Sequence, residues 1–223
     1  FDLRQNGGGS PTMVQFLCSY LFSGDEPVHL NSLYSRETDS LNQFWTLPHV
    51  PGKRLDTVPI FVLTSSRTFS GAEEFCFNLQ TRDRATIVGE TTGGGANPGG
   101  TRRIDTHFAA FIPNGRAVNP VTNTNWEGVG VKPDVECAAD KALDTAHNLA
   151  VDNASARLYL CGADGPTSGL VIFSVANPAT PQYLGSYSGV YVHDAHVVTY
   201  TSGPLAGRQL AYCFVGDRGI DIV

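Results

Sequence analysis

Residues 58–79 read VPIFVLTSSRTFSGAEEFCFNL, an apolar stretch that passes through a short polar turn into a second apolar stretch. The first part, residues 58–64, is rich in β-branched and aromatic side chains and predicts a buried strand. The second part repeats its apolar residues at helical spacing, which predicts one buried helix face made of Ala72, Phe75, Cys76 and Leu79. A strand followed directly by a helix indicates an α/β fold.

The flanking sequence adds elements of the same kind. An apolar run from Met13 to Phe22 predicts a helix, a polar loop follows it, and residues 85–89 predict a second short strand. The glycine-rich residues 91–100 predict a flexible loop. A hairpin is expected beyond it, with arms at residues 106–112 and 116–121 and the turn residues Pro113-Asn114-Gly115 between them.

The texture of the chain changes near residue 146, where we expect a domain boundary. Helix signals end there, and short β-rich runs follow between clusters of glycine, proline, asparagine and aspartate: residues 158–161, 169–175, 183–187, 196–200 and 209–214. Residues 218–223 echo residues 169–173 about 50 residues later, which is the period of propeller blades. The second segment, residues 147–223, therefore predicts an incomplete all-β domain.

Composition excludes several classes of function. A formal charge of −6, with basic residues scattered along the chain, argues against nucleic acid as a partner. No apolar run is long enough to cross a bilayer. The five cysteines include no C-x-x-C pair, so their spacing does not fit zinc, and we expect them to be small buried hydrophobes.

Ser70 stands where the predicted strand turns into the helix. A hydroxyl at such a corner is exposed at the carboxyl edge of the sheet, and the first free helix amides, beginning with Gly71, point toward an oxyanion formed there. The alternative is that Ser70 only caps the helix, with Glu73 three residues later completing a capping box. The local sequence does not separate the two interpretations.

Four motifs in order resemble the carboxyl-terminal processing and tricorn-type serine peptidases, especially bacterial members related to interphotoreceptor retinoid-binding protein. The motifs lie at residues 2–9, 62–75, 87–95 and 125–134. The resemblance implies that residues 1–146 form the carboxyl-terminal half of a crotonase/ClpP-like ββα catalytic subdomain. It implies a serine endopeptidase that acts on peptides or unfolded protein tails, needs no cofactor, and is secreted, periplasmic or on the cell surface.

The same resemblance assigns roles to individual residues. Ser70 is the implied nucleophile, with Ser65 and Ser66 as strand-end residues. Gly71 and either Gly8 or Gly9 supply the oxyanion amides, and the substrate-binding loop is Gly93, Gly94 and Gly95. Glu127, 57 residues after Ser70, resembles the glutamate that orients the base or the substrate, although a solvated turn carboxylate is the alternative.

The general base is the missing part of this constellation. The processing branch uses a lysine, but Gly95 occupies the corresponding place and no lysine lies between Lys53 and Lys132. The tricorn-like branch uses an earlier histidine, which we expect before Phe1. His49 and His107 are expected to be surface or pocket residues, so we expect the chain alone to be inactive.

The second segment resembles the LVIVD-repeat β-propellers of bacterial cell-surface proteins, over residues 169–178, 191–200 and 207–213. This implies a module for a protein partner, with further sequence after Val223. His193, Asp194 and His196 form a metal-like cluster, but neighbouring strand residues face opposite ways, so we expect hydrogen bonding there. Two other functions remain open: a silent binding protein for an apolar ligand, and a surface interaction protein that works through the propeller.

Overall fold

The computed structural model describes residues 1–147, 149–152, 155–162, 169–177, 180–215 and 219–223. The chain divides into two compact units, Phe1–Ala142 and Leu143–Val223. The predicted boundary near residue 146 falls inside the short helix α3 (Ala142–His147). Within the described residues, no helix is long and apolar enough to span a bilayer.

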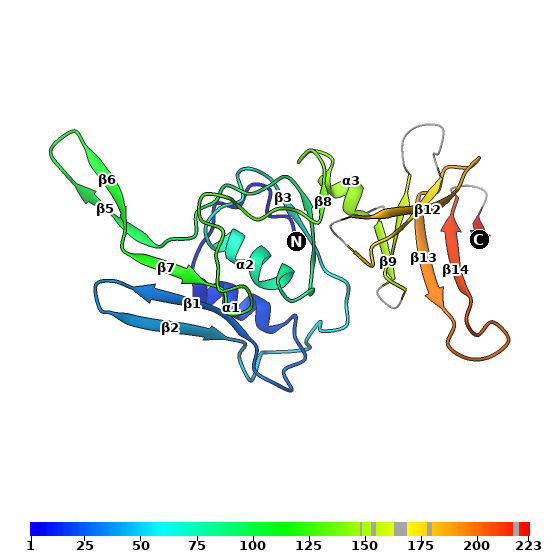
Figure 1. The fold of residues 1–223 in the computed structure, drawn as a ribbon, viewed down its shortest axis with the longest axis horizontal. Coiled ribbons are helices and arrows are strands. Elements are labelled where there is room, and N and C mark those ends of the chain that lie inside the picture. The colour runs from blue at the N-terminus through cyan, green and yellow to red at the C-terminus, as the bar shows by residue number, and fades with distance from the viewer. Residues whose placement is uncertain (148, 153–154, 163–168, 178–179, 216–218) are drawn as a thin grey trace. The chain divides into compact units, whose positions relative to one another are not determined.

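A small parallel sheet carries the turn that contains Ser70 (Figure 1). Strand β3 (Phe61–Thr64) pairs with β4 (Thr86–Gly89), and β4 pairs with β8 (Val135–Glu136). Helix α2 (Gly71–Gln80) connects β3 to β4, so the predicted strand, helix and strand form one β-α-β unit. Asp2 pairs with Leu63 on the other edge, which brings the first residues of the chain beside β3.

The core of this unit lies between the sheet and two helices. Helix α1 (Pro11–Ser19) packs beside α2, and the predicted face of α2 is buried as expected, with Ala72, Phe75, Cys76 and Leu79 at most 4 % exposed. Cys18 of α1 is fully buried in the same core. Four of the five cysteines are buried and all five are free thiols, so the prediction for them is confirmed except at the half-buried Cys137.

The expected polar loop after α1 contains a hairpin that the sequence did not reveal. Strand β1 (His29–Ser35) pairs with β2 (Ser40–Trp45) on one edge and with β7 (Gly115–Val118) on the other. The burial pattern explains the miss, because two of the three buried residues of β1 are the polar Asn31 and Ser32. No apolar alternation marks this strand.

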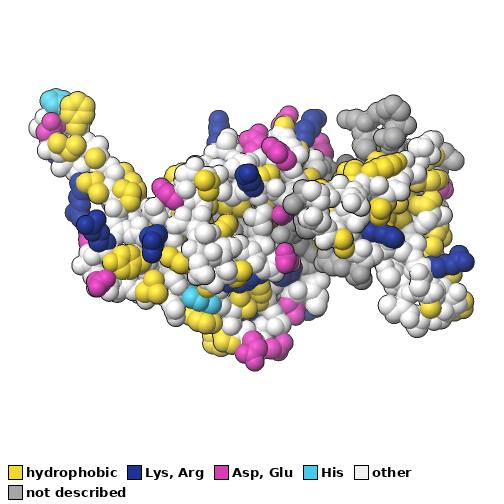
Figure 2. All heavy atoms as spheres, viewed as in Figure 1, with side chains coloured by type: hydrophobic (Ala, Val, Ile, Leu, Met, Phe, Trp, Pro, Cys, Tyr) yellow, Lys and Arg dark blue, Asp and Glu magenta, His cyan; other side chains and the backbone are white. Residues whose placement is uncertain are grey.

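The predicted hairpin of residues 106–112 and 116–121 is wrong in its pairing. Strand β6 (Ala109–Pro113) pairs instead with β5 (Gly99–Arg103), whose first two residues fall in the stretch expected to be a loop. The physical reason is a contact from outside the turn, since the amides of Asn114 and Gly115 both donate to the carbonyl of Pro98, which comes directly before β5. The β5–β6 hairpin projects from the body of the unit (Figure 1), and Figure 2 shows hydrophobic side chains along it.

The second unit contains two antiparallel sheets, each built from strands in sequence order. The first contains β9 (Leu149–Asp152), β10 (Arg157–Cys161), β11 (Leu170–Ser174) and β12 (Gln182–Tyr187). The second contains β13 (Asp194–Thr199), β14 (Gln209–Phe214) and β15 (Ile220–Ile222). The five predicted strand runs are confirmed. Consecutive meanders of this kind agree with propeller blades, but the described residues form no closed ring, so the propeller stays a prediction.

Candidate active site

The turn between β3 and α2 is tied to the start of the chain by hydroxyl groups. Ser65 Oγ donates to the carbonyl of Arg4 at 2.5 Å, and Thr68 Oγ1 donates to the carbonyl of Leu3 at 2.8 Å. Ser65 is only 4 % exposed, so its hydroxyl is occupied in the interior. This position suits a structural serine at the end of the strand.

Ser70 is exposed at the end of this turn and has an unusual backbone. Its φ is 51° and its ψ is −122°, whereas a residue that caps a helix normally has an extended backbone. A non-glycine residue held at positive φ costs about 1–3 kcal/mol and persists only where its surroundings fix it. The amide of Ser70 donates to Glu73 Oε2 at 2.8 Å, as a capping box requires. Capping therefore accounts for Glu73 but not for the strained backbone of Ser70.

The glycine turn of residues 6–9 lies directly against Ser70 and Gly71. The amide of Phe69 donates to the carbonyl of Asn6 at 3.1 Å. A Cβ added to Gly8, whose φ is +108°, would stand 2.7 Å from Ser70 Cβ and 2.8 Å from Gly71 N. A Cβ added to Gly71 would stand 2.8 Å from the carbonyl oxygen of Gly9. Only glycine fits at Gly8 and Gly71, because the two backbones touch there.

Two amides at this contact are free to bind an anion. Gly8 N donates to the side chain of Asn6 at 2.9 Å, which occupies it. In the part of the chain that the structure describes, no hydrogen bond uses the amide of Gly9 or of Gly71. Of the two candidates named from sequence, Gly9 is therefore the better placed to act with Gly71 as an oxyanion donor.

Glu73 is a fully buried carboxylate that joins the Ser70 corner to the glycine-rich loop. Its Oε2 accepts the amides of Ser70 and Gly95, both at 2.8 Å. Its Oε1 accepts the hydroxyl of Thr92 at 2.5 Å and the amide of Gly94 at 2.6 Å. All four partners donate, which requires an acceptor-only carboxylate. The position of Glu73 three residues after Ser70 predicted its bond to the Ser70 amide. Its contacts with Thr92, Gly94 and Gly95 join residues far apart in the sequence, so motif spacing could not predict them.

Two of the three predicted substrate-binding glycines, Gly94 and Gly95, are bound by this carboxylate. Gly93 N donates to the carbonyl of Thr68 at 3.0 Å, so the amides of Gly93, Gly94 and Gly95 are all occupied. The exposed ring of Phe69 packs on the loop, and a Cβ at Gly93 or Gly95 would stand 2.7 Å or less from it. The glycines thus allow Phe69 to lie beside Ser70.

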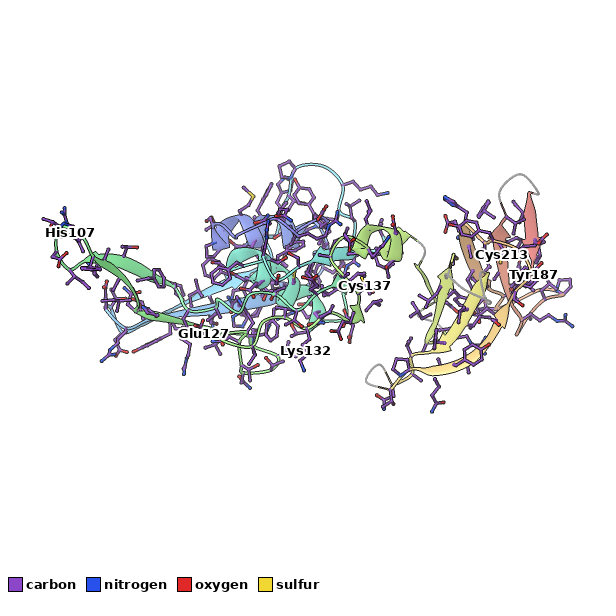
Figure 3. All side chains as sticks on the ribbon, turned by 90° about the horizontal axis from the view of Figure 1, so that it is seen from above. His107, Glu127, Lys132, Cys137, Tyr187 and Cys213 are labelled. Carbon is purple, nitrogen blue, oxygen red and sulfur yellow. The ribbon has the colours of Figure 1, made fainter. Side chains whose placement is uncertain are left out.

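Glu127 holds the same loop from its other end. Its Oε2 accepts the amides of Ala96 and Asn97 at 2.7 and 2.8 Å, and Gly128 N donates to the carbonyl of Gly94 at 2.8 Å. Figure 3 shows Glu127 at the base of the projecting hairpin. Its carboxylate is bonded to backbone, so the structure places Glu127 as a support of the loop that Glu73 also holds.

The described residues place no histidine of the first unit in hydrogen-bond contact with Ser70. His107 lies at the outer tip of the hairpin (Figure 3), and His49 is exposed. His29, which the sequence interpretation passed over, stacks on Trp45 with its Nε2 2.9 Å from Ser32 Oγ, and burial lowers its pKa. Arg82, which follows α2, donates to the carbonyl of His29, so β1 packs against this helix.

The metal-like cluster of the second unit belongs to an ordinary strand. Asp194 and His196 lie on β13 opposite Phe214 and Tyr212, and the amide of His193 donates to the carbonyl of Phe214. Nowhere among the described residues do three or more histidine, cysteine, aspartate or glutamate side chains gather as a metal site would require.

Comparison with known proteins identifies a family whose members are similar to this chain. The model of Peptidase family S41 matches residues 1–137. A protein of Bacteroides fragilis NCTC 9343 assigned to the S41 proteases is 24 % identical, with a TM-score of 0.52 over 65 % of this chain and 38 % of its own. A protein of Parabacteroides merdae ATCC 43184 assigned as a peptidase is 22 % identical, with a TM-score of 0.51 over 62 % of this chain and 44 % of its own. Mature CPAF is 18 % identical, with a TM-score of 0.51 over 63 % of this chain and 39 % of its own. The chain thus spans less than half of each of these structures.

Proposed function

The chain belongs to peptidase family S41, and we propose on that premise that its first unit is part of a serine endopeptidase acting on peptides or unfolded protein tails. The observation that carries the proposal is the Ser70 corner, where an exposed, strained serine stands beside two unoccupied amides. Strain and exposure at a strand-to-helix turn are what a nucleophilic serine requires. They have no use in a helix cap.

In the proposed reaction, Ser70 Oγ attacks the carbonyl carbon of the peptide bond, its proton passes through a base to the leaving amine, and the C–N bond breaks to give an acyl-enzyme. A water molecule then attacks the acyl-enzyme, which releases the new carboxyl terminus and restores the Ser70 hydroxyl. The amides of Gly71 and Gly9 hold the negative charge that develops on the carbonyl oxygen. Glu73 positions both Ser70 and the glycine-rich loop without touching the reacting atoms. The proton of Ser70 must pass to a base other than His29, His49 and His107, because none of these contacts it.

The loop of residues 93–97 has few free backbone groups with which it could bind a peptide substrate. Its amides from Gly93 to Asn97 are all occupied, by Thr68, Glu73 and Glu127. Backbone contact between a substrate and this loop therefore uses the carbonyl oxygens that remain free, with the exposed ring of Phe69 beside them. In this proposal Glu127 acts by fixing the loop that lies beside the substrate.

The test is labelling of the protein at its full natural length with a fluorophosphonate probe, followed by peptide mapping of the adduct. We expect the adduct on Ser70 and no adduct in the Ser70→Ala variant. Ser66→Ala is the matched control, because Ser66 lies exposed in the same turn and its hydroxyl does not tie the turn to the start of the chain, and it should still be labelled at Ser70. Equal labelling of wild type and Ser70→Ala would end the peptidase proposal.

Two wider expectations accompany this proposal. The resemblance to secreted peptidases supports a location outside the cytoplasm, which cell fractionation with an antibody to the chain would test. The meandering sheets of the second unit support a propeller-type module for a protein partner. Cells that carry the whole chain and cells that carry the first unit alone would be crosslinked in parallel. If the second unit binds the partner, the partner should be crosslinked to the whole chain and not to the first unit alone.

A further inference from the structure

The β5–β6 hairpin, called the arm below, exposes four large apolar side chains. Ile104, Phe108, Phe111 and Ile112 are 51–70 % exposed, and Figure 2 shows hydrophobic side chains along the arm. Among the described residues, its two strands form a sheet of their own, so both edges of the arm are unpaired. An isolated two-stranded hairpin is only marginally stable in water, whereas three or more strands form a stable sheet. The arm thus lacks the further strands that a stable sheet requires.

The two edges of the arm differ in how well they are protected against pairing. Strand β5 carries Arg102 and Arg103, and charged side chains are a common means by which an edge strand avoids another strand. Strand β6 reads AAFIP and carries no charge. Because an uncharged apolar edge attracts other strands, β6 is the edge open for pairing.

The backbone of β6 presents hydrogen-bonding groups to such a strand. Ile104 N donates to the carbonyl of Phe108 at 2.9 Å inside the arm. Since the bonds of an antiparallel pair alternate along each strand, Phe108 directs its backbone groups toward β5, and Ala109 and Phe111 direct theirs outward. Pro113 is the next outward position and offers only its carbonyl oxygen. The outer edge of β6 therefore has donors at two positions and acceptors at three.

We propose that β6 pairs antiparallel with β6 of a second copy of this chain, about a two-fold axis at Phe111. In this register Phe111 lies opposite the same residue of the second copy, and Ala109 lies opposite Pro113. The two Phe111 residues exchange a pair of backbone hydrogen bonds, and each Ala109 amide donates to the opposing Pro113 carbonyl. The two arms then form one sheet of four strands, which meets the need that each arm leaves open.

The charges at the two ends of the arm favour a second copy as the occupant. Asp105 lies at the tip, where its Oδ1 accepts the amides of His107 and Phe108. Arg116 follows the base of the arm on β7, is exposed, and forms no hydrogen bond or ion pair with any residue that the structure describes. An antiparallel two-fold contact brings the tip of each arm to the base of the other. Opposite charges, Asp105 and Arg116, therefore meet at both ends of the contact.

Cysteine crosslinking tests this register. The Cα atoms of a hydrogen-bonded antiparallel pair lie about 5.5 Å apart, a separation that a disulfide spans. We expect Phe111→Cys in the 223-residue chain to form a disulfide-linked dimer under mild oxidation. Thr101→Cys is the matched control, because Thr101 is the exposed cross-strand neighbour of Phe111 on the β5 edge, and it should stay monomeric. Ala109→Cys should also stay monomeric, because in this register its two copies lie about 14 Å apart.

Sedimentation equilibrium measures the same contact without a crosslink. One pair of short strands covers less than the about 1,200 Å² of a stable interface, so we expect a dissociation constant of about 10–500 µM. Phe111→Lys would set two like charges opposite each other at the axis and should raise this constant at least about fivefold. Thr101→Lys, the same charge on the other edge, should leave it unchanged. Wild type oxidised in parallel gives the background from the native thiols, which are buried or half-buried.

Several results would overturn the proposal. Equal crosslinking of Phe111→Cys and Thr101→Cys would show collision without a register. A dimer that Phe111→Lys leaves unchanged would place the interface elsewhere on the chain. Wild type that stays monomeric, with Phe111→Cys uncrosslinked, would leave the β6 edge to a strand of another protein. Association of the 223-residue chain that disappears at full natural length would assign the edge to another part of the same chain.

Discussion

Replacing Glu73 by glutamine tests whether a buried carboxylate holds the Ser70 corner. Each carboxylate oxygen accepts two donors, and the amide nitrogen of glutamine would take the place of one oxygen and face two donors. A hydrogen bond to a charged group contributes about 1.5–3 kcal/mol. Removal of a buried charge returns part of the loss, because its desolvation penalty disappears. We expect Glu73→Gln to lower the free energy of unfolding by about 3 kcal/mol.

The neighbouring residue provides the matched control. Glu74 is also buried, at 4 % exposure, but burial raises its pKa to about 7. A glutamine resembles its protonated form, so Glu74→Gln should match the wild type below about pH 4.5 and, at pH 7, should be more stable than the wild type by up to about 3 kcal/mol, a change opposite in sign to that of Glu73→Gln. Both tryptophans of the chain, Trp45 and Trp126, lie in the first unit, so tryptophan fluorescence in urea follows that unit alone.

The same variants have a second readout in the labelling of Ser70. Glu73→Gln leaves Ser70 N without a charged acceptor, so the rate of fluorophosphonate labelling should fall about tenfold or more, equivalent to about 1.4 kcal/mol. Glu74→Gln should label like the wild type. Equal losses of stability and of labelling in the two variants would refute the reasoning, because they would show that burial alone, and not the four hydrogen bonds, sets the cost.

Three further predictions concern other parts of the first unit. Burial raises the pKa of Glu74 to about 7, so ionisation of this group costs the folded chain about 3 kcal/mol of stability as pH rises from about 4.5 through 7. The urea midpoint should therefore be lower at pH 8 than at pH 5, and Glu74→Gln should reduce that difference. Gly8→Ala should abolish labelling of Ser70, because its Cβ would overlap Ser70 and Gly71, whereas Gly7→Ala, where the space is open, should label normally. Arg84 donates to the carbonyls of Leu55 and Val58, so Arg84→Ala should speed proteolytic cleavage between residues 47 and 58, and unchanged cleavage would show that other contacts hold that loop.

The sequence predicted the central β-α-β unit because each of its elements has a clear local signal. Strand β3, helix α2 and strand β4 all appear within a few residues of their expected bounds. The strands of the second unit were found for the same reason, since apolar runs alternate there with glycine and proline. Local pattern was sufficient wherever the buried side chains were apolar.

The remainder depended on contacts between residues far apart in the chain. Strand β1 buries Asn31 and Ser32, so its sequence reads as a loop. The hairpin arm at β5 begins with Gly99 and Gly100, which carry no strand signal, and the carbonyl of Pro98 before it accepts the amides of Asn114 and Gly115 after β6. At the candidate site, Ser70 and the glycine turn were named from motif spacing, but the choice between Gly8 and Gly9 depended on the side chain of Asn6.

The strained backbone of Ser70 allows the capping and nucleophile interpretations to be separated by stability alone. A residue at φ 51° costs about 1–3 kcal/mol unless it is glycine, which adopts positive φ freely. Relief of this strain should make Ser70→Gly more stable than Ser70→Ala, by about 1 kcal/mol, under either interpretation. Ser70→Ala keeps the strained backbone and removes only the hydroxyl. If the hydroxyl caps the helix, Ser70→Ala should be about 1 kcal/mol less stable than the wild type. If the hydroxyl is present for its chemistry, Ser70→Ala should unfold at the same urea concentration as the wild type while losing all labelling, so the urea midpoint of this variant separates the two interpretations.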